Sequence, residues 1–160
     1  MDTAGKLAEH CLGSSDLVSN DGEAVILARI VSELLSQGNT RATEHIKTDS
    51  IGIITPYRAQ LKVLASRLSE VSAAAAAVEA FTIDRYQGRD KDVILVSLVR
   101  SNESNTIGEL LLDWQRLNVA LTRARKLMVI VGHLGMLEQV SSMWRNLGQH
   151  LRSNGWVVRL

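Results

Sequence analysis

Apolar residues occur along this chain in two alternating kinds of segment. Short runs that are apolar at nearly every position predict strands buried on both faces of a sheet. We expect these strands at residues 51–54, 78–82, 93–99 and 127–131, with a further edge strand at 156–158. Segments with apolar residues at every third or fourth position predict helices, expected at 20–37, 55–68, 113–126 and 134–151. This alternation predicts an α/β fold: a doubly wound, mainly parallel sheet with helices on both faces.

Two of the helix starts carry capping signals. Asn20 followed by Glu23 resembles a capping box, and Gly38 is expected to end that helix. Thr55 is expected to cap the next helix, with Pro56 at the first helical position, where a missing N–H costs nothing.

Composition limits the organisation of the chain. A length of 160 residues with 46% hydrophobic residues suits one domain with a single core. We place this domain at 20–160, after a small, polar lead-in at 1–19. The net charge is only +1, so any binding of nucleic acid has to come from local patches.

Cysteine and histidine usage makes a metal site unexpected. The one cysteine, Cys11, excludes a disulfide framework or a multi-cysteine zinc or iron–sulfur site within the chain, and it fits a reducing compartment. The histidines lack metal-ligand spacing. No apolar run reaches the roughly 18 residues that a membrane span requires, and no signal-peptide pattern is present. We therefore expect a soluble, intracellular protein without a membrane partner.

Two polar segments directly follow predicted strands. Thr55 to Arg58 follows one strand, and Thr82 to Asp90 follows another. In open parallel sheets, ligands bind in the crevice at the carboxyl ends of the strands. Both segments are therefore expected at the same edge of the sheet.

Arginines line one face of the predicted helix at 113–126. Its buried face is predicted to contain Trp114, Leu117, Leu121 and Ala124, whereas Arg116 and Arg123 lie seven positions apart on a different face. Guanidinium groups bind phosphate oxygens in a bidentate manner, so these arginines are candidates for binding the terminal phosphate of a nucleotide. The alternative is a basic stripe that only faces water.

The segment around Gly88 has two interpretations. It could be a plain turn in which Gly88 supplies a positive φ. In the functional interpretation, Gln87 and Asp90 bind a ribose or position water, and Thr82 holds a nucleic-acid phosphate.

The segment after the first predicted strand also has two interpretations. Thr55 and Arg58 combine a hydroxyl and a basic side chain with a helix N-terminus, which attracts anions. A nucleic-acid backbone phosphate is the expected ligand, with Tyr57 alongside. The alternative is an ordinary helix start with Tyr57 in the core.

One familiar phosphate-binding element is missing from the sequence. No glycine-rich loop ends in Gly-Lys-Ser/Thr, so there is no Walker A cradle. No acidic pair ends an apolar strand as a magnesium-binding Walker B would. The chain is therefore expected to form one wall of a nucleotide cleft.

Taken together, these residues resemble the second RecA-like domain of superfamily 1B helicases, of the nonsense-mediated-decay helicase and senataxin type. The resemblance rests on Asn20–Ala24, Ile51–Gln60, Val78–Asp92 (motif V) and Arg116–Arg125 (motif VI). Within that group, the segments 83–91 and 108–114 are most similar to the DNA replication ATP-dependent helicase/nuclease (Dna-two) family.

This resemblance implies roles for single residues. Arg123 would be the arginine finger that reaches the γ-phosphate, and Gly88 and Asp90 would approach the nucleotide. Thr55 and Thr82 would contact single-stranded DNA. ATP with Mg²⁺ would be held mainly by a first RecA-like domain that this chain lacks.

The resemblance also implies a setting for the domain. The first RecA-like domain and an iron–sulfur nuclease domain are expected upstream, so we interpret the chain as a C-terminal fragment that is inactive alone. The full-length enzyme would be a helicase of DNA replication and repair in the nucleus, with the mitochondrion as a second location. An RNA helicase of the same superfamily and a non-catalytic module for single-stranded nucleic acid remain alternatives.

Overall fold

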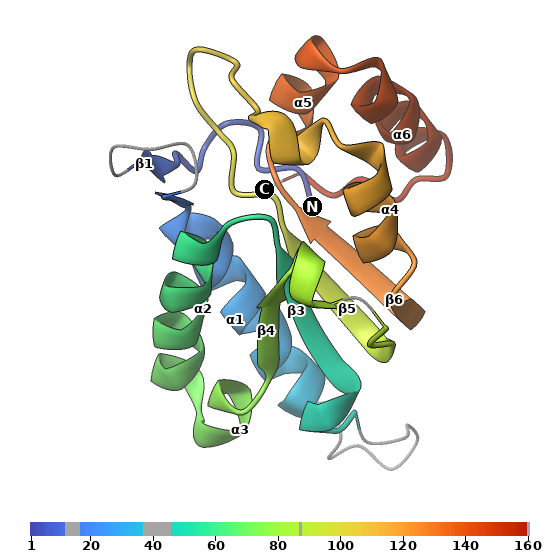
Figure 1. Ribbon diagram of the computed structural model, residues 1–160. Helices are drawn as coiled ribbons and strands as arrows, with labels where there is room; N and C mark the ends of the chain where they lie inside the picture. Colours follow the sequence, from blue (N-terminus) through green and yellow to red (C-terminus); the bar gives the residue numbers. More distant parts are fainter. Residues whose placement is uncertain (12–16, 37–45, 87, 160) are drawn as a thin grey trace.

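A four-stranded parallel sheet forms the centre of the molecule (Figure 1). The computed structural model describes residues 1–11, 17–36, 46–86 and 88–159. The strand order is β4-β3-β5-β6. The strands are β3 (Ile51–Thr55), β4 (Glu79–Thr82), β5 (Lys91–Ser97) and β6 (Ala124–Val131). The predicted α/β fold with a mainly parallel sheet is confirmed.

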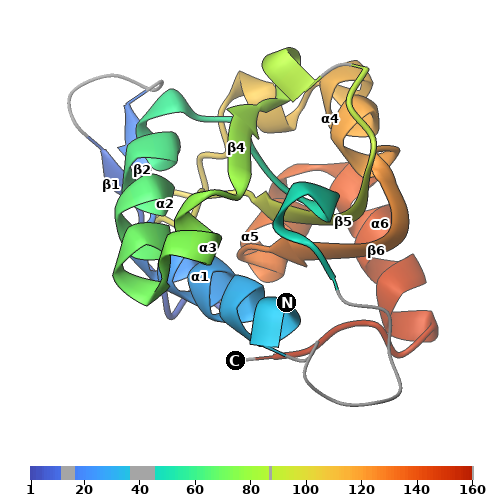
Figure 2. The ribbon, with the colours of Figure 1, turned by 90° about the horizontal axis from the view of Figure 1, so that it is seen from below.

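Helices cover both faces of this sheet, as Figures 1 and 2 show from two directions. One face packs against α1 (Asp21–Ser36), α2 (Arg58–Val71) and α3 (Ala73–Ala76). The other packs against α4 (Trp114–Leu121), α5 (Leu134–Val140) and α6 (Ser142–Ser153), with the short helices η3 (Ile83–Tyr86) and η4 (Glu109–Leu111). A further short helix, η2 (Thr48–Ser50), precedes β3. Because β5 contributes alternate side chains to both cores, its interior is apolar throughout.

The predicted helix at 113–126 is wrong at its carboxyl end. Helix α4 ends at Leu121, and β6 already begins at Ala124, which pairs with Lys91 of β5. This pairing draws the last residues of the predicted helix into the sheet. Arg123 therefore lies in the turn between α4 and β6, away from a helical face shared with Arg116. The predicted burial of Trp114 is also wrong, because its side chain is 54% exposed.

The start of α1 confirms half of the predicted capping box. The Oδ1 atom of Asn20 accepts a hydrogen bond from the Glu23 N–H at 3.0 Å. The Glu23 carboxylate, however, turns toward the sheet, where the Ser97 hydroxyl (2.7 Å) and the Val99 N–H (2.9 Å) donate to it. Gly38, the predicted end of this helix, lies outside the described residues.

Helix α2 begins later than predicted. Its cap is Tyr57, which is extended (φ −113°, ψ 129°), and Arg58 is its first helical residue. Pro56 therefore precedes the cap, where its fixed ring suits the extended chain leaving β3. The Thr55 hydroxyl accepts a hydrogen bond from the Tyr57 N–H at 3.4 Å, which closes a local turn and leaves the helix without a side-chain cap.

The segment predicted as a lead-in contains ordered structure. The strands β1 (His10–Cys11) and β2 (Val18–Ser19) form an antiparallel pair. At the other end of this segment, Asp2 forms parallel bridges with Gly132 and with Arg159. The edge strand predicted at 156–158 is wrong, because these residues form no strand and the bridge to Asp2 is at Arg159. Among the described residues, no helix has the length and apolar character needed to cross a membrane.

Candidate nucleotide and nucleic-acid site

The carboxyl ends of β3 and β4 bring two threonines together. Thr55 and Thr82 are opposite each other in the parallel register of these strands. Thr55 is fully buried and Thr82 is 8% exposed. The predicted convergence of the two segments at one sheet edge is therefore correct for their first residues.

Tyr57 forms part of the core beneath this edge. Its ring is 2% exposed, and its hydroxyl donates to the Ile107 carbonyl oxygen at 3.2 Å. The guanidinium carbon of Arg100 lies 6.0 Å from the ring centroid. Arg58, in contrast, is exposed at the first position of α2. The segment from Thr55 to Arg58 thus places a buried tyrosine beside an exposed cation at a helix N-terminus.

The segment 82–90 connects the two ends of the sheet. Thr82 ends β4 at the carboxyl end, whereas Asp90 directly precedes β5 at the amino end. Because β4 and β5 both run parallel to β3, the chain has to return across the sheet between them. The prediction that Thr82 and Asp90 share one edge is therefore wrong. Gly88 has φ +79° and is exposed, as expected for a turn glycine; Gln87, the remaining candidate of this turn, lies outside the described residues.

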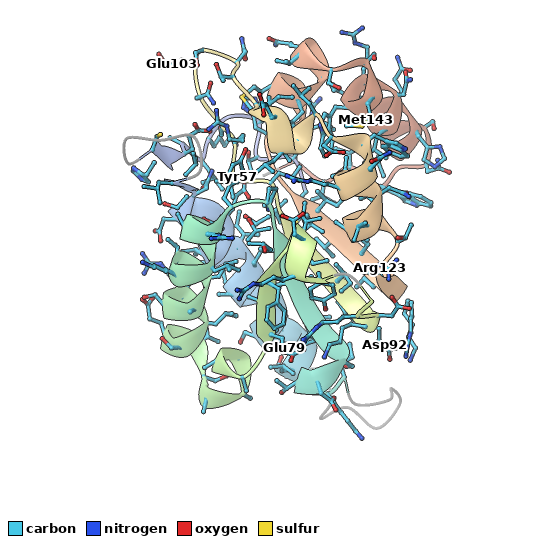
Figure 3. The ribbon with its side chains drawn as sticks, viewed as in Figure 1. Tyr57, Glu79, Asp92, Glu103, Arg123 and Met143 are labelled. Atoms are coloured by element: carbon cyan, nitrogen blue, oxygen red, sulfur yellow. The ribbon has the colours of Figure 1, made fainter. Side chains whose placement is uncertain are left out.

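Arg123, labelled in Figure 3, directly precedes β6, and several interactions fix its side chain. Its Nη1 atom lies 3.0 Å from Oδ1 of Asp90. Its Nε donates to the Val119 carbonyl oxygen at 3.0 Å, and its Nη2 donates to the Thr122 hydroxyl at 3.2 Å. The side chain is 24% exposed. The carbonyl oxygen of Arg123 also accepts a hydrogen bond from the Lys91 N–H at 3.1 Å, which ties the two turns together.

Arg116 has a separate, acidic environment at the start of α4. Its Nε lies 3.5 Å from a carboxylate oxygen of Asp84 and 3.5 Å from one of Asp113. Asp113 also caps α4, accepting from the backbone N–H groups of Gln115 and Arg116. These residues line a small polar pocket of about 230 Å³ together with Ile83 and Val119. Arg116 and Arg123 thus have different carboxylate partners, although Val119, whose carbonyl oxygen accepts from Arg123, also lines the pocket at Arg116.

A buried polar network supports the carboxyl end of the sheet, and the sequence analysis missed it. Gln60 accepts from the Asn20 N–H (2.7 Å) and donates to the Ser97 hydroxyl (3.1 Å), which in turn donates to Glu23. Complete burial raises the pKa of the Glu23 carboxyl to about 7, although hydrogen bonds from the Ser97 hydroxyl and from the backbone oppose this shift. In the sequence, this network is indicated only by Glu23 and Gln60, which are polar residues among the apolar positions of their helices.

A second missed contact fixes the loop that follows β5. Arg100 and Glu9 form a buried ion pair, 3.2 Å apart, with side chains 7% and 9% exposed. Arg100 also donates twice to the Thr106 carbonyl oxygen. This loop packs over Tyr57 through Ile107.

Gly52 is required by close packing beneath η3. A Cβ atom at Gly52 would lie 1.8 Å from the hydroxyl oxygen of Tyr86, whose ring is fully buried. Burial raises the pKa of the Tyr86 hydroxyl to about 12. The contact fixes η3, and with it the first part of the segment that joins Thr82 to Asp90. Within the described ranges, no group of three or more His, Cys, Asp or Glu side chains could hold a metal ion.

The fold and the site define a class of protein. The mainly parallel sheet with helices on both faces is consistent with a RecA-like domain. Residues 1–135 match the family model described as "AAA domain", which is more than half of the chain. The chain therefore belongs to this family.

Known proteins with similar sequences are replication helicase/nucleases. The protein described as DNA replication ATP-dependent helicase/nuclease DNA2 from Bos taurus is 43% identical over 143 residues, covering 89% of this chain and 12% of the relative. The corresponding protein of Schizosaccharomyces pombe is 40% identical over 147 residues, covering 92% and 10%. The Arabidopsis thaliana helicase/nuclease JHS1 is 44% identical over 125 residues, covering 77% and 8%. The resemblance predicted from the sequence is confirmed, and the chain spans about a tenth of the length of these relatives.

Proposed function

We propose that this chain is the second motor domain of an ATP-dependent DNA helicase/nuclease that acts in DNA replication and repair in the nucleus. The observation that carries this proposal is Arg123, whose guanidinium is fixed by Val119, Thr122 and Asp90 in a turn beside the sheet. A cation held in this way is organised to receive an anion. Its role is that of the arginine finger in ATP hydrolysis.

The finger acts when phosphate oxygens replace its carboxylate partner. The Nη1 atom of Arg123 binds Asp90 at a site where the two side chains are 24% and 45% exposed, so a phosphate can approach from the solvent. A guanidinium at this place stabilises the charge that develops on the transferred phosphoryl group, which contributes about 10³–10⁵ in rate in well-studied cases. Mg²⁺ and the phosphate-binding loop are supplied by the first RecA-like domain.

The other residues predicted to bind the nucleotide act on the same ligand as Arg123. Asp90, released from Arg123, and Gln87 bind the ribose or position the attacking water. The exposed, positive-φ Gly88 allows the backbone of the turn to approach the nucleotide closely. Arg116 supplies a second cation once its carboxylate partners, Asp84 and Asp113, exchange for phosphate.

The carboxyl end of the sheet holds single-stranded DNA. Thr55 and Thr82 lie side by side there with nearly buried side chains, so they fix the backbone of the proposed grip. Tyr57 is buried in the core, and Arg58 offers an exposed cation at the start of α2. Contacts of this kind bind the DNA backbone without reading its sequence. ATP-driven closure of two RecA-like domains then moves this grip along the strand.

The decisive experiment uses Arg123→Ala in the complete helicase that contains this domain. We expect DNA-stimulated ATP hydrolysis to fall by about 10³-fold or more, while binding of ATP, measured with a fluorescent nucleotide, is largely retained. Arg145→Ala is the control, because Arg145 is an exposed arginine on α6, remote from the site. Unchanged turnover in the Arg123 variant would rule out the finger assignment.

A further inference from the structure

Val99, shortly after the end of β5, has a backbone conformation that a β-branched residue rarely adopts. Its φ is +71°, in the left-handed region. The Arg100 N–H donates to the Leu98 carbonyl oxygen at 2.8 Å, and this bond across a single residue closes a γ-turn of the rare, strained kind. Val99 is fully buried. Such strain persists only where the surroundings impose it, and it is concentrated at functional positions.

Two side chains at the start of α1 hold both polar groups of the Val99 backbone. The Glu23 carboxylate accepts from the Val99 N–H at 2.9 Å, and the Asn20 side-chain amide donates to the Val99 carbonyl oxygen at 3.0 Å. All three residues are fully buried, so bulk water does not reach either bond. The Asn20–Glu23 clamp, as we call these two side chains, therefore stabilises the left-handed conformation of Val99.

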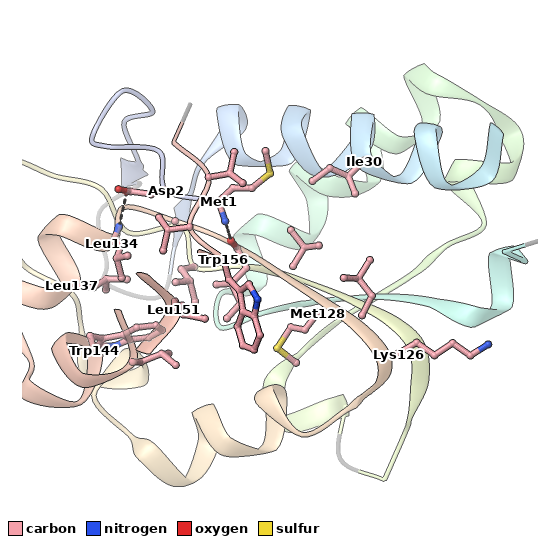
Figure 4. A pocket seen from close by; sticks show the side chains of 18 residues that line it. Met1, Asp2, Ile30, Lys126, Met128, Leu134, Leu137, Trp144, Leu151 and Trp156 are labelled. Atoms are coloured by element: carbon pink, nitrogen blue, oxygen red, sulfur yellow. Dashed lines mark hydrogen bonds between the residues drawn. The ribbon is translucent and has the colours of Figure 1, made fainter. Parts of the chain in front are cut away.

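Leu98, the residue before the turn, is fixed on the side of β6. Its N–H donates to the Val131 carbonyl oxygen at 3.0 Å. Its side chain is among those that line an apolar pocket of about 690 Å³ beside β6 (Figure 4). A Cβ atom at Gly132 would lie 2.8 Å from a methyl carbon of Leu98, so the packing there is close. Because Leu98 is held by the sheet and Val99 by the clamp, the γ-turn sets the direction of the chain that follows.

The turn leads the Arg100 side chain onto Tyr57. The guanidinium carbon of Arg100 lies 6.0 Å from the centroid of the Tyr57 ring. Its Nε and Nη2 atoms donate to the Thr106 carbonyl oxygen at 3.0 and 2.7 Å, and the Tyr57 hydroxyl donates to the Ile107 carbonyl oxygen. The loop 100–107 is therefore held against Tyr57 at both of its ends.

The same clamp is bonded to the first turn of α2, where the proposed DNA contacts lie. The Gln60 side chain accepts from the Asn20 N–H at 2.7 Å and donates to the Asn20 carbonyl oxygen at 2.9 Å. Gln60 lies two residues after the exposed Arg58. The Asn20–Glu23 clamp thus holds both the loop that packs on Tyr57 and the helix that begins beside it.

We propose that Asn20 and Glu23 are positioning residues for the binding of single-stranded DNA. They impose the strained γ-turn, the turn seats the loop 100–107 on Tyr57, and this contact fixes the segment 55–58 in the geometry that binds the strand. The place of DNA at this segment rests on the proposed function. The link between the clamp and the order of the loop rests on the contacts alone.

The test uses Glu23→Leu in the complete helicase that contains this domain, because leucine cannot accept the hydrogen bond from Val99. We expect amide hydrogen exchange in 98–107 to become faster by about tenfold or more, since the strained turn then opens more readily. The concentration of single-stranded DNA that half-maximally stimulates ATP hydrolysis is expected to rise, rather than kcat at saturating DNA to fall. A variant that is only less stable would instead lose kcat, because less folded enzyme would be present.

Three matched variants separate the clamp from general stability. Glu23→Gln keeps an acceptor in place and is expected to retain both measurements. Asn20→Ser keeps a side chain that caps α1 but is too short to hold Val99, so it is expected to reproduce both changes, and it replaces Glu23→Leu if that variant does not fold. Leu27→Ala removes a fully buried side chain one turn further along α1 and is expected to leave both measurements unchanged.

The role of strain is tested in the Val99→Gly background, because glycine adopts a positive φ without a steric cost. There Glu23→Leu is expected to speed up exchange in 98–107 clearly less than it does beside Val99. Comparing each pair of variants within one background cancels the packing that is lost with the valine side chain. An equal increase in both backgrounds would overturn the role of the strained turn.

Further outcomes would overturn the proposal. Unchanged exchange in 98–107 for Glu23→Leu, or an equal increase for Leu27→Ala, would show that the clamp does not order the loop. Faster exchange with an unchanged half-maximal DNA concentration would show that the loop does not position the DNA contacts. A wild-type helicase that does not respond to DNA would instead contradict the proposed function, and hydrogen exchange would still decide whether the clamp orders the loop.

Discussion

The two ends of the sheet in this domain differ in how they hold their polar side chains. At the carboxyl end, Thr55 and Thr82 are nearly inaccessible, and the residues behind them are linked by buried hydrogen bonds. At the amino end, Arg123 is partly exposed and is paired with an aspartate. The difference separates two tasks. Buried, hydrogen-bonded side chains fix a backbone, whereas an ion pair at the surface can exchange its partner for a ligand.

The largest effect on ATP hydrolysis is expected from a change of Asp90, which forms the exposed ion pair at the amino end of the sheet. In the complete helicase, Asp90→Asn is expected to lower kcat for ATP hydrolysis by about 10²-fold. The proposed finger would lose the ion pair that positions it, and a misplacement of about an ångström costs that much. Steady-state kinetics would check this. A ribose contact by Asp90 would appear as a raised KM as well. A faster enzyme would instead show that Asp90 restrains Arg123, which would reverse the proposed relation between the two residues.

The buried end is expected to respond to pH. Burial raises the pKa of Glu23 to about 7 from its ordinary value of 4.5, so the folded state binds the proton more tightly than the unfolded state. The resulting stability is fully present below about pH 4.5 and is lost as the pH rises toward 7, by up to about 3 kcal/mol in total. Glu23→Gln is expected to remove this dependence in urea denaturation from pH 5 to 8. A parallel pH profile in the variant would contradict the assignment.

Overpacking can test the contact between Gly52 and Tyr86, which fixes the segment that joins the two ends of the sheet. Gly52→Ala places a Cβ where the Tyr86 hydroxyl lies, 1.8 Å away, and is expected to cost about 1–3 kcal/mol of unfolding free energy. Adding Tyr86→Phe removes the clashing oxygen and is expected to recover part of this loss. Thermal unfolding of the two single variants and the double variant would measure the coupling. If the changes in unfolding free energy of the two single variants simply add up in the double variant, the contact is not the cause of the lost stability.

The smallest effect is expected at the exposed cation of the carboxyl end. Arg58→Ala is expected to weaken single-stranded DNA binding only a few-fold and to reduce the slope of log affinity against log salt by about 0.7, the value for one phosphate contact. Arg29→Ala, at an exposed position on α1, is the control. Fluorescence anisotropy with matched DNA and RNA strands would also distinguish a DNA from an RNA motor. An unchanged salt slope would remove Arg58 from the grip.

The sequence predicted the carboxyl end better than the amino end. Thr55 and Thr82 could be placed together because strands in a parallel sheet end at one edge, a rule that needs only the strand assignments. Arg123 could not be placed, because apolar residues at helical spacing continue as far as Ala124 while pairing with β5 converts these residues into a strand. The local periodicity indicated a helix, whereas pairing with the distant strand β5 makes these residues part of a strand.

The amino-terminal residues also form a pairing that their local sequence pattern does not predict. Nothing in the local pattern of residues 1–3 indicates a strand, yet they pair with Gly132 and Arg159, which are far away in the sequence. The edge strand predicted at 156–158 has the expected apolar composition. This segment forms no strand, and the only pairing near it in the described residues is the bridge from Arg159 to Asp2.

The segment from Ile83 to Asp90 has a consequence for how the two ends communicate. It is the short covalent path between Thr82, at the carboxyl end, and the partner of Arg123, at the amino end, and its first half is immobilised by Tyr86 against Gly52. Under the proposed function, a nucleotide that shifts Asp90 would therefore act on the piece of backbone that carries the proposed DNA contact. Thermodynamic linkage makes such an effect mutual: by whatever factor ATP changes the affinity of this domain for DNA, DNA changes its affinity for ATP.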